Sequence, residues 1–439
     1  MDKVQLFLYF IVIILAGSIF LSQPFVYKSG ESVPFIDVLF TSVSAVCVTG
    51  LSTVNMDIYT PAGFIILMIL IEFGGLGIIS FVSIYIIVPK RRISLVNRMV
   101  IRDFFIDDVE IEPKKILRSI IVFTISIEAI CSVFLFYGFR KAGSTQPVLD
   151  AAFHAVSAFC NAGFSTYNDS LALFTQNNSI MIPMMILIVA GGIGFIVLKD
   201  VANVLFGNRH KLSLHSVVAL SVSVFLIIIG AVFFLIAEQG NTLCRFDFLK
   251  RLKICLFQAI TPRTAGFSTI TIAQCKPISK LVMIVLMFIG GSPGSTAGGV
   301  KTTTFFITIM YVIRGNIERN GLNIRNRNIE TAVIEKAFSI VAKSTIIIMV
   351  TLSLLLITEE PSLQAGSISV FDLLFETVSA FATVGLSTGV TSGLSLLGKV
   401  VIIGTMFIGR TGIAAMAMGI ARNEKERFYE YPSANIMVG

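Results

Sequence analysis

The phrase LLFETVSAFATVGLST at residues 373–388 has three close copies earlier in the chain. They are VLFTSVSAVCVTGLST at 38–53, AAFHAVSAFCNAGFST at 151–166 and CLFQAITPRTAGFST at 255–269. Each copy is an apolar stretch that ends in one glycine followed by a Phe or Leu and a Ser-Thr pair, and the glycines are Gly50, Gly163, Gly266 and Gly385. These glycines lie 113, 103 and 119 residues apart, so a unit of about 110 residues fits the 439-residue chain four times.

The chain around these copies is strongly apolar. Its mean hydropathy is +0.88 and only 14% of its residues are charged, whereas about a quarter are charged in a soluble domain. A helix needs about 20 apolar residues to cross a bilayer. Eight apolar runs approach or exceed that length, at 4–21, 63–88, 116–139, 180–198, 214–237, 278–313, 332–357 and 396–420. The sequence therefore predicts a polytopic membrane protein.

Each unit contains its segments in the same order: a spanning run, a polar turn, a short apolar segment, the glycine motif and a second spanning run. Re-entrant helices are expected where an apolar segment is too short to span, and the short segments are 35–46, 148–159, 246–260 and 371–381. Irregular backbone at membrane depth is tolerated only inside protein or along water. Four such loops are therefore best placed around one axis.

We therefore predict an all-α polytopic membrane protein with four pseudo-symmetric membrane-pore-membrane repeats. Eight transmembrane helices and four re-entrant pore helices would surround one central pore. The repeats are expected at 1–90, 114–208, 212–315 and 331–422, followed by a cytoplasmic C-terminal tail at 423–439.

The net charge of +8 could indicate a nucleic-acid surface, but its distribution favours membrane topology. Basic residues gather in the segments between span pairs and after the last span: Lys90, Arg91, Arg92, Arg98, Arg102, Lys114, Lys115, Lys199, Arg209, Lys211, Arg314, Arg319, Arg325, Arg327, Arg422, Lys425 and Arg427. The alternate segments are poorer in Lys and Arg, except around 245–253. Cytoplasmic segments carry such an excess. We expect membrane lipid as the surroundings, both termini in the cytoplasm, and no nucleic acid as a partner.

The repeated phrase predicts an ion filter. A re-entrant helix that ends at mid-membrane points the negative end of its dipole at the pore axis. Glycine gives the following loop backbone angles closed to other residues and keeps side chains out of the lumen. Rings of backbone carbonyls form the selectivity filters of potassium channels. The predicted filter residues are Thr49, Gly50, Leu51, Ala162, Gly163, Phe164, Ala265, Gly266, Phe267, Val384, Gly385 and Leu386.

Side chains next to the filter are expected to support it: Ser52, Thr53, Asn161, Ser165, Thr166, Ser268, Thr269, Thr383, Ser387 and Thr388. A single Gly-x-Ser-Thr phrase is an ordinary turn after a helix. Four copies in register, each between spanning segments, favour the filter. One glycine per unit, where the potassium-channel phrase TVGYG has two, predicts a shorter and less selective filter.

A second glycine-rich stretch, GGSPGSTAGGV at 290–300, interrupts the run 278–313. So many Gly, Pro and Ser residues cannot remain helical at an acceptable cost, and this is the only Gly-broken span that the sequence indicates. GSTAGGVKT at 294–302 resembles a phosphate-binding loop, but no strand precedes it. GGSPG matches a nucleophile motif without a strand-turn-helix context or triad partners. A flexible plug across the permeation path explains the stretch better than either enzyme motif.

The chain resembles the Trk/Ktr/HKT superfamily of potassium-transporting membrane subunits, most closely its KtrB-like bacterial branch. The four loops TGLST, NAGFST, RTAGFST and VGLST carry this resemblance, together with EFGGLGI at 72–78, GGSPGSTAGGVKTTT at 290–304 and GRTG at 409–412. The match covers the whole chain. It implies potassium uptake across the bacterial cytoplasmic (inner) membrane by a homodimer, with a cytosolic ring of nucleotide-binding RCK (KtrA-like) subunits. Any nucleotide would be bound by that partner, and no covalent cofactor is expected.

The resemblance also implies roles for particular residues. A serine at the first filter glycine is associated with sodium preference in this family, so glycine at all four positions favours K+, the one metal ion expected. A gate is implied at the intramembrane loop 290–302 with an arginine below the filter: Gly290, Gly291, Ser292, Pro293, Gly294, Ser295, Thr296, Gly298, Gly299, Lys301 and Arg410. We expect Arg410 to contact carbonyls of that loop, with Glu72 as a candidate counter-charge.

Polar residues outside the loops have less specific interpretations, and two are possible for the acidic ones. Acidic residues near the expected outer mouth either concentrate cations or form a solvated rim without a specific site: Asp57, Asp169, Glu359, Glu360 and Glu376. Arg263 is expected to brace the third loop. Cys47 and Cys160 share one repeat position and are interpreted as small packing residues, and no Cys or His spacing indicates a metal site.

The main alternative to a channel-like subunit is a secondary cation carrier, coupled to Na+ or H+, with alternating access. Such carriers usually have broken helices in matching positions of inverted halves, whereas this chain has same-direction repeats. A membrane enzyme would need clustered catalytic side chains at depth, and the sequence contains none. We therefore predict that the protein is not an enzyme.

Overall fold

The computed structural model describes residues 2–76, 113–207, 211–314, 322–324 and 327–412. The predicted tail 423–439 lies outside the described residues, as do most of the basic segment 89–115 and the ends of the second and eighth predicted spans. Most of the described chain is helical. A short antiparallel hairpin, β1 (Leu322–Ile324) with β2 (Arg327–Ile329), precedes the last quarter.

Each quarter of the chain contains one short helix between the helices of its two predicted spans. The first contains α1 (Asp2–Leu21), α2 (Phe35–Val46) and α3 (Pro61–Gly75). The second contains α6 (Pro113–Lys141), α7 (Pro147–Phe159), α8 (Asn178–Ile193) and α9 (Phe195–Leu205). The third contains α10 (Leu214–Glu238), α11 (Phe248–Ile260), α12 (Pro277–Phe288) and α13 (Thr302–Arg314). The fourth contains α14 (Thr331–Thr358), α15 (Glu360–Gln364), α16 (Val370–Phe381), α17 (Leu396–Phe407) and the π turn η6 (Ile408–Gly412).

The four short helices α2, α7, α11 and α16 begin and end within two residues of their predicted bounds. Local signals define the helices that follow them. Pro61 and Pro277 occupy the first position of α3 and α12, where the missing N–H has no intrahelical partner in any case. Thr60 and Ser395 cap α3 and α17 by accepting backbone N–H groups with their side chains.

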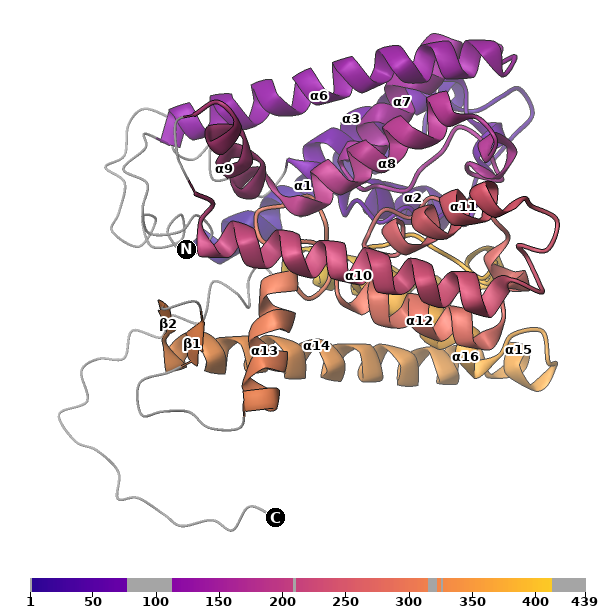
Figure 1. Cartoon of the computed structure of the whole chain (residues 1–439). Helices are drawn as coiled ribbons and strands as arrows, with labels where there is room; N and C mark the ends of the chain where they lie inside the picture. The colour runs from indigo at the N-terminus through magenta and orange to yellow at the C-terminus, as the bar shows by residue number, and fades with distance from the viewer. Residues whose placement is uncertain (1, 77–112, 208–210, 315–321, 325–326, 413–439) are drawn as a thin grey trace.

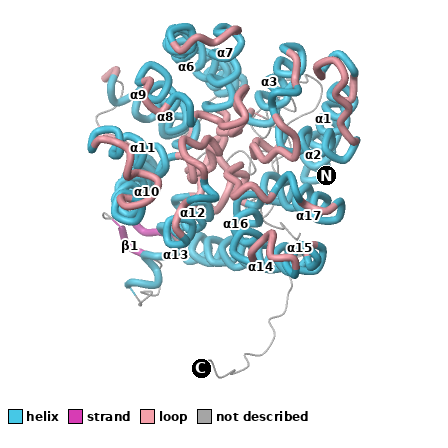
Figure 2. Tube along the Cα trace, turned by 90° about the vertical axis from the view of Figure 1, so that its right-hand side faces the viewer, coloured by secondary structure: helices cyan, strands magenta, loops and turns pink. Residues whose placement is uncertain are grey.

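The helices surround a core of loops (Figure 2). The long helices α6, α10 and α14 run in roughly the same direction on different sides of the molecule (Figures 1 and 2), and each carries an exposed apolar face, with Ile130, Phe225 and Ile346 as examples. By length and composition, three helices of the described residues can cross a membrane, and the bent pair α8–α9 is a fourth candidate. Apolar side chains on the outside and loops in the centre are the arrangement expected of a protein whose surroundings are lipid.

Within the described residues two spans are broken, whereas the sequence indicated one. The run 278–313 is interrupted between α12 and α13, as predicted. The run 180–198 is also interrupted, because α8 and α9 meet at 105°. Gly194, at the bend, has φ 92°, which favours glycine. A Cβ there would lie 2.8 Å from the carbonyl oxygen of Pro293. The bend between α8 and α9 therefore lies against the glycine-rich loop between α12 and α13. The apolar run 180–198 alone does not indicate this contact.

Candidate ion pathway

The four glycine loops have one backbone conformation. Gly50, Gly163, Gly266 and Gly385 all have positive φ, between 73° and 92°. The residue two positions earlier also has positive φ in every copy: Val48, Asn161, Thr264 and Thr383. Positive φ is uncommon outside glycine and is a clear outlier for β-branched residues. Its recurrence at one position shows that the surrounding structure imposes this backbone, a form of strain that clusters at functional sites.

The loops form a closed ring. A Cβ placed on Gly50 would lie within 3.0 Å of the carbonyl oxygen of Ala162 in the second loop. The same close approach leads from Gly163 to Ala265, from Gly266 to Val384 and from Gly385 back to Thr49. Each glycine therefore faces the carbonyl of the residue that precedes the next glycine. No larger residue fits these positions without moving a neighbouring backbone.

The short helices hold the loops by two sets of side chains. A hydroxyl six residues before each glycine, or five in the third copy, bonds to the loop backbone. Ser44 and Ser379 accept the N–H of Gly50 and Gly385, each at 3.1 Å. Ser157 and Thr261 donate to the carbonyls of Phe164 and Phe267 at 2.7 and 2.6 Å.

The second set consists of the residues that directly follow the phenylalanine shared by all four copies. Their side chains differ from copy to copy. His154 Nε2 lies 3.0 Å from Ser165 Oγ, and Gln258 donates to Thr269 at 2.9 Å. Glu376 accepts from Ser387, from the N–H of Thr388 and from Thr391. These three residues reach the predicted supporting hydroxyls, although the sequence analysis did not single out His154 or Gln258.

A cavity of about 610 Å³ opens on the side of the ring formed by the residues that follow each glycine. Its lining includes Ser52, Thr53, Ser165, Ser268, Ser387 and Thr388. Asp169 also lines it, but the interpretation of Glu359 and Glu376 as rim residues is wrong. Both are buried. Glu359 accepts the N–H and hydroxyl of Ser395 at 3.0 and 2.6 Å, because a buried carboxylate needs donors.

The glycine-rich loop 289–301 lies on the opposite side of the ring, against residues that precede the glycines. Thr296 Oγ1 donates to the carbonyls of Phe159 and Gly191 at 3.1 and 3.2 Å, and it lies 3.1 Å from the side-chain amide of Asn161. A Cβ on Gly298 would come within 3.0 Å of the carbonyl oxygen of Ala382 and of Thr383 Oγ1. The loop therefore contacts the ends of two short helices, α7 and α16.

Arg410 anchors this loop. Its guanidinium donates to the carbonyl of Thr296, to Gly74 at 2.8 Å and to Gly75 at 3.5 Å. Contact with carbonyls of the loop was expected, but the pairing with Glu72 was not correct. Glu72 instead accepts from the Cys160 thiol at 3.4 Å. Lys301 bonds within the loop, donating to Ala297 at 2.6 Å, and Arg263 ties the third loop to Ser223 of α10 at 2.9 Å.

The sequence analysis missed a second fourfold pattern. GGLG at 74–77, GGIG at 191–194, GGSPG at 290–294 and GRTG at 409–412 occupy matching places in the second predicted span of each quarter. A Cβ on Gly74, Gly191 or Gly409 would lie within 3.0 Å of the last carbonyl oxygen of the preceding short helix: Val46, Phe159 or Phe381. Gly290 faces Gly298 of the intramembrane loop instead. Arg410 therefore stands where the other three quarters have a second glycine.

The comparisons with known proteins agree with this geometry. Residues 9–431 match the TrkH family, described as a cation transport protein. The chain belongs to the TrkH family. Relatives include the potassium/sodium uptake protein NtpJ of Enterococcus hirae, 38% identical over 98% of this chain and 95% of the relative. The Ktr system potassium uptake protein B of Bacillus subtilis is 33% identical over 98% and 95%, and its namesake in Vibrio alginolyticus is 32% identical over 98% and 93%.

The fold of this TrkH family member matches a solved structure of the same family. The potassium transporter TrkH from Vibrio parahaemolyticus superposes with a TM-score of 0.72 at 20% identity, covering 93% of this chain and 82% of that chain. The predicted resemblance to the Trk/Ktr/HKT superfamily is thus confirmed. The protein is a multi-pass membrane transporter for cations and not an enzyme.

Proposed function

We propose that the chain is the ion-translocating subunit of a Trk/Ktr-type potassium uptake system and that the four glycine loops are its selectivity filter. The closed ring carries this proposal, because each glycine meets the carbonyl of the next loop. Backbone carbonyls arranged around one axis replace the hydration shell of K+. The names of three relatives, which include potassium uptake, support K+ as the substrate.

The loop 290–302 and Arg410 would form the gate. The loop lies against the ends of α7 and α16 on the side of the ring opposite the 610 Å³ cavity. An ion that has passed the ring must therefore pass the loop. The buried guanidinium of Arg410 places a positive charge at this point, which disfavours cations until the loop and the arginine move.

The resemblance also implies the surroundings and the assembly that we propose. We expect four pseudo-symmetric repeats, the bacterial cytoplasmic membrane with both termini in the cytoplasm, a homodimer, and a cytosolic RCK ring that binds the nucleotide. Light scattering of the detergent-purified chain, alone and with a KtrA-like subunit, measures the last two directly. A monomer that does not bind the ring would reject this assembly while leaving the filter proposal intact.

The filter is tested by transport in a bacterium that lacks its own potassium uptake systems. Gly50→Ser and Gly163→Ser place a Cβ within 3.0 Å of the neighbouring loop, with Gly163 the less crowded of the two. Gly393→Ser is the matched control, because nothing lies within 4 Å of a Cβ there. We expect wild type and Gly393→Ser to restore growth at low K+. The two filter variants should show a lower ratio of rubidium to sodium uptake.

Unchanged selectivity and rate in a folded, membrane-inserted Gly163→Ser would reject the loops as the filter and favour the carrier with alternating access. The gate needs its own variant, the deletion of residues 294–299, co-expressed with a KtrA-like subunit. We expect high rubidium flux that no longer depends on that subunit. A deletion variant that keeps the filter's selectivity but still requires the subunit would contradict the gate.

A further inference from the structure

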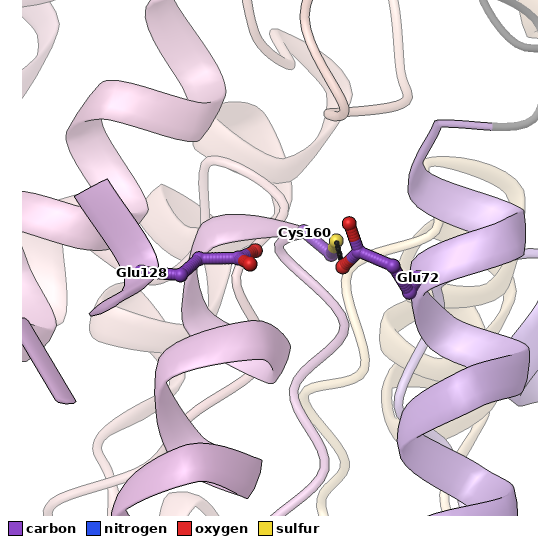
Figure 3. A group of neighbouring side chains, drawn as sticks. All are labelled: Glu72, Glu128 and Cys160. Carbon is purple, nitrogen blue, oxygen red and sulfur yellow. Dashed lines mark hydrogen bonds between the residues drawn. The ribbon is translucent and has the colours of Figure 1, made fainter. Parts of the chain in front are cut away.

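Two carboxylates, one buried and one half-buried, lie close to a buried thiol (Figure 3). Glu72 comes from α3, Glu128 from α6, and Cys160 ends the short helix α7. One ligand atom from each residue lies within 4.8 Å of the other two. The group therefore joins the first and second quarters of the chain at the level where α7 ends.

The Glu128 side chain shows that this cluster is incomplete by itself. Glu128 is 8% exposed, and its Oε1 atom has no hydrogen-bond partner among the described residues. Figure 3 shows its carboxylate directed at Cys160 and Glu72. A buried carboxylate without a donor is costly. The guanidinium of Arg410 donates to the carbonyls of Thr296, Gly74 and Gly75. Neither glutamate forms an ion pair with a cationic side chain in the described part of the chain.

We propose that Glu72, Glu128 and Cys160 bind one divalent transition-metal ion of the Zn2+ class. Thiolates favour such metals over alkali or alkaline-earth ions. Zn2+ at about 2.3 Å from sulfur and about 2.0–2.2 Å from a carboxylate oxygen places these atoms about 3.5 Å apart at a tetrahedral angle. Cys160 Sγ and Glu72 Oε2 are already 3.4 Å apart. A rotation of the Glu128 side chain brings in the third ligand, and the fourth position stays open for water.

The position gives the bound metal a structural consequence. Cys160 lies three residues before the filter glycine Gly163 and touches Gly75, where a Cβ would lie 2.5 Å from its sulfur. A metal held by α3, α6 and the end of α7 would cross-link these helices. The site does not depend on the proposed K+ function, because binding is measured without transport.

The test uses the full-length protein, purified free of metal, in a Cys244→Ser background because Cys244 is exposed. Cd2+ is the probe, read by the ultraviolet absorbance of the thiolate–Cd2+ bond, and Zn2+ is the competitor. We expect one Cd2+ per chain, displaced by Zn2+. Cys160→Ser should abolish the absorbance, and Glu128→Gln should weaken binding by at least about tenfold.

Cys47→Ser is the matched control, because Cys47 ends α2 as Cys160 ends α7 and is buried too. It should bind Cd2+ as the starting protein does. Each variant is compared by its elution profile, so loss of binding is separated from loss of folding. Equal absorbance with and without Cys160, or full affinity in Glu128→Gln, would overturn the metal site. Absence of binding in the starting protein would overturn it too.

Discussion

The contact between α8 and the end of α7 leads to a prediction that two adjacent glycines can test. A Cβ on Gly191 would lie 2.9 Å from the carbonyl carbon of Phe159 and nearer still to its oxygen. Ordinary contact begins at 3.4 Å, so Gly191→Ala must move the two backbones apart by at least 0.5 Å. At the neighbouring Gly192, the nearest atom to a Cβ lies 3.7 Å away, on the Asn161 side chain. Gly192→Ala therefore fits without any movement.

Both substitutions lie in α8 and share the gain in helix propensity, about 1 kcal/mol for Gly to Ala. Their difference isolates the clash, for which overpacking gives about 1–3 kcal/mol. We expect Gly191→Ala to unfold at lower temperature than Gly192→Ala in detergent and to lose rubidium uptake, since Phe159 lies four residues before Gly163. Equal unfolding temperatures and equal uptake for the two variants would refute the assigned contact.

Three further substitutions test other contacts. Arg410→Gln removes the charge-assisted hydrogen bond to the carbonyl of Thr296, which is worth about 1.5–3 kcal/mol. Rubidium flux should therefore rise about 10- to 100-fold, while the control Arg140→Gln, at an exposed position, should leave it unchanged. Unchanged flux in folded Arg410→Gln would contradict the role of Arg410 in holding the loop. Lys399→Met leaves Asp37 without its partner at 2.6 Å and should cost up to about 3–5 kcal/mol. Lys280 lies 3.4 Å from Asp372, which is more exposed than Asp37, so Lys280→Met should lower the free energy of unfolding by less. A lower unfolding temperature for Lys280→Met than for Lys399→Met would count against the importance of the Lys399–Asp37 pair. Glu376→Gln should lower the free energy of unfolding by about 1–3 kcal/mol and speed hydrogen exchange of the Thr388 amide, which donates to Glu376. Glu360→Gln, at an exposed position, should do neither. Equal exchange rates in the two variants would argue against Glu376 as a support of the fourth loop.

Much of the architecture could be predicted because its signals are local and repeated. The short helices recur with the period of the chain, and the glycine that ends each motif has the positive φ that its loop requires. The interruption between α12 and α13 could also be predicted, because Gly, Pro and Ser disfavour a helix wherever they occur in a protein. These features needed no knowledge of what each segment contacts.

The missed features depend on partners that are distant in the chain. Glu359 and Glu376 were interpreted as rim residues because an acid beside a membrane span usually meets water, yet each faces hydroxyls from a later segment, such as Ser395 and Ser387. The bend at Gly194 lies against Pro293, a residue about 100 positions later, and the run around the bend is apolar throughout. The glycine pairs escaped notice because the fourth quarter replaces the second glycine with Arg410.

The closure of the ring between the first and last quarters also bears on how the protein is made. Lys399 pairs with Asp37 across 362 residues, and Gly385 lies against Thr49. At about 5–20 residues per second, a ribosome needs about 20–70 s to add that length of chain. During this interval the first loop has no neighbour from the fourth. A nascent chain that lacks the fourth quarter thus cannot close the proposed filter, and the ring is completed only when synthesis is nearly finished.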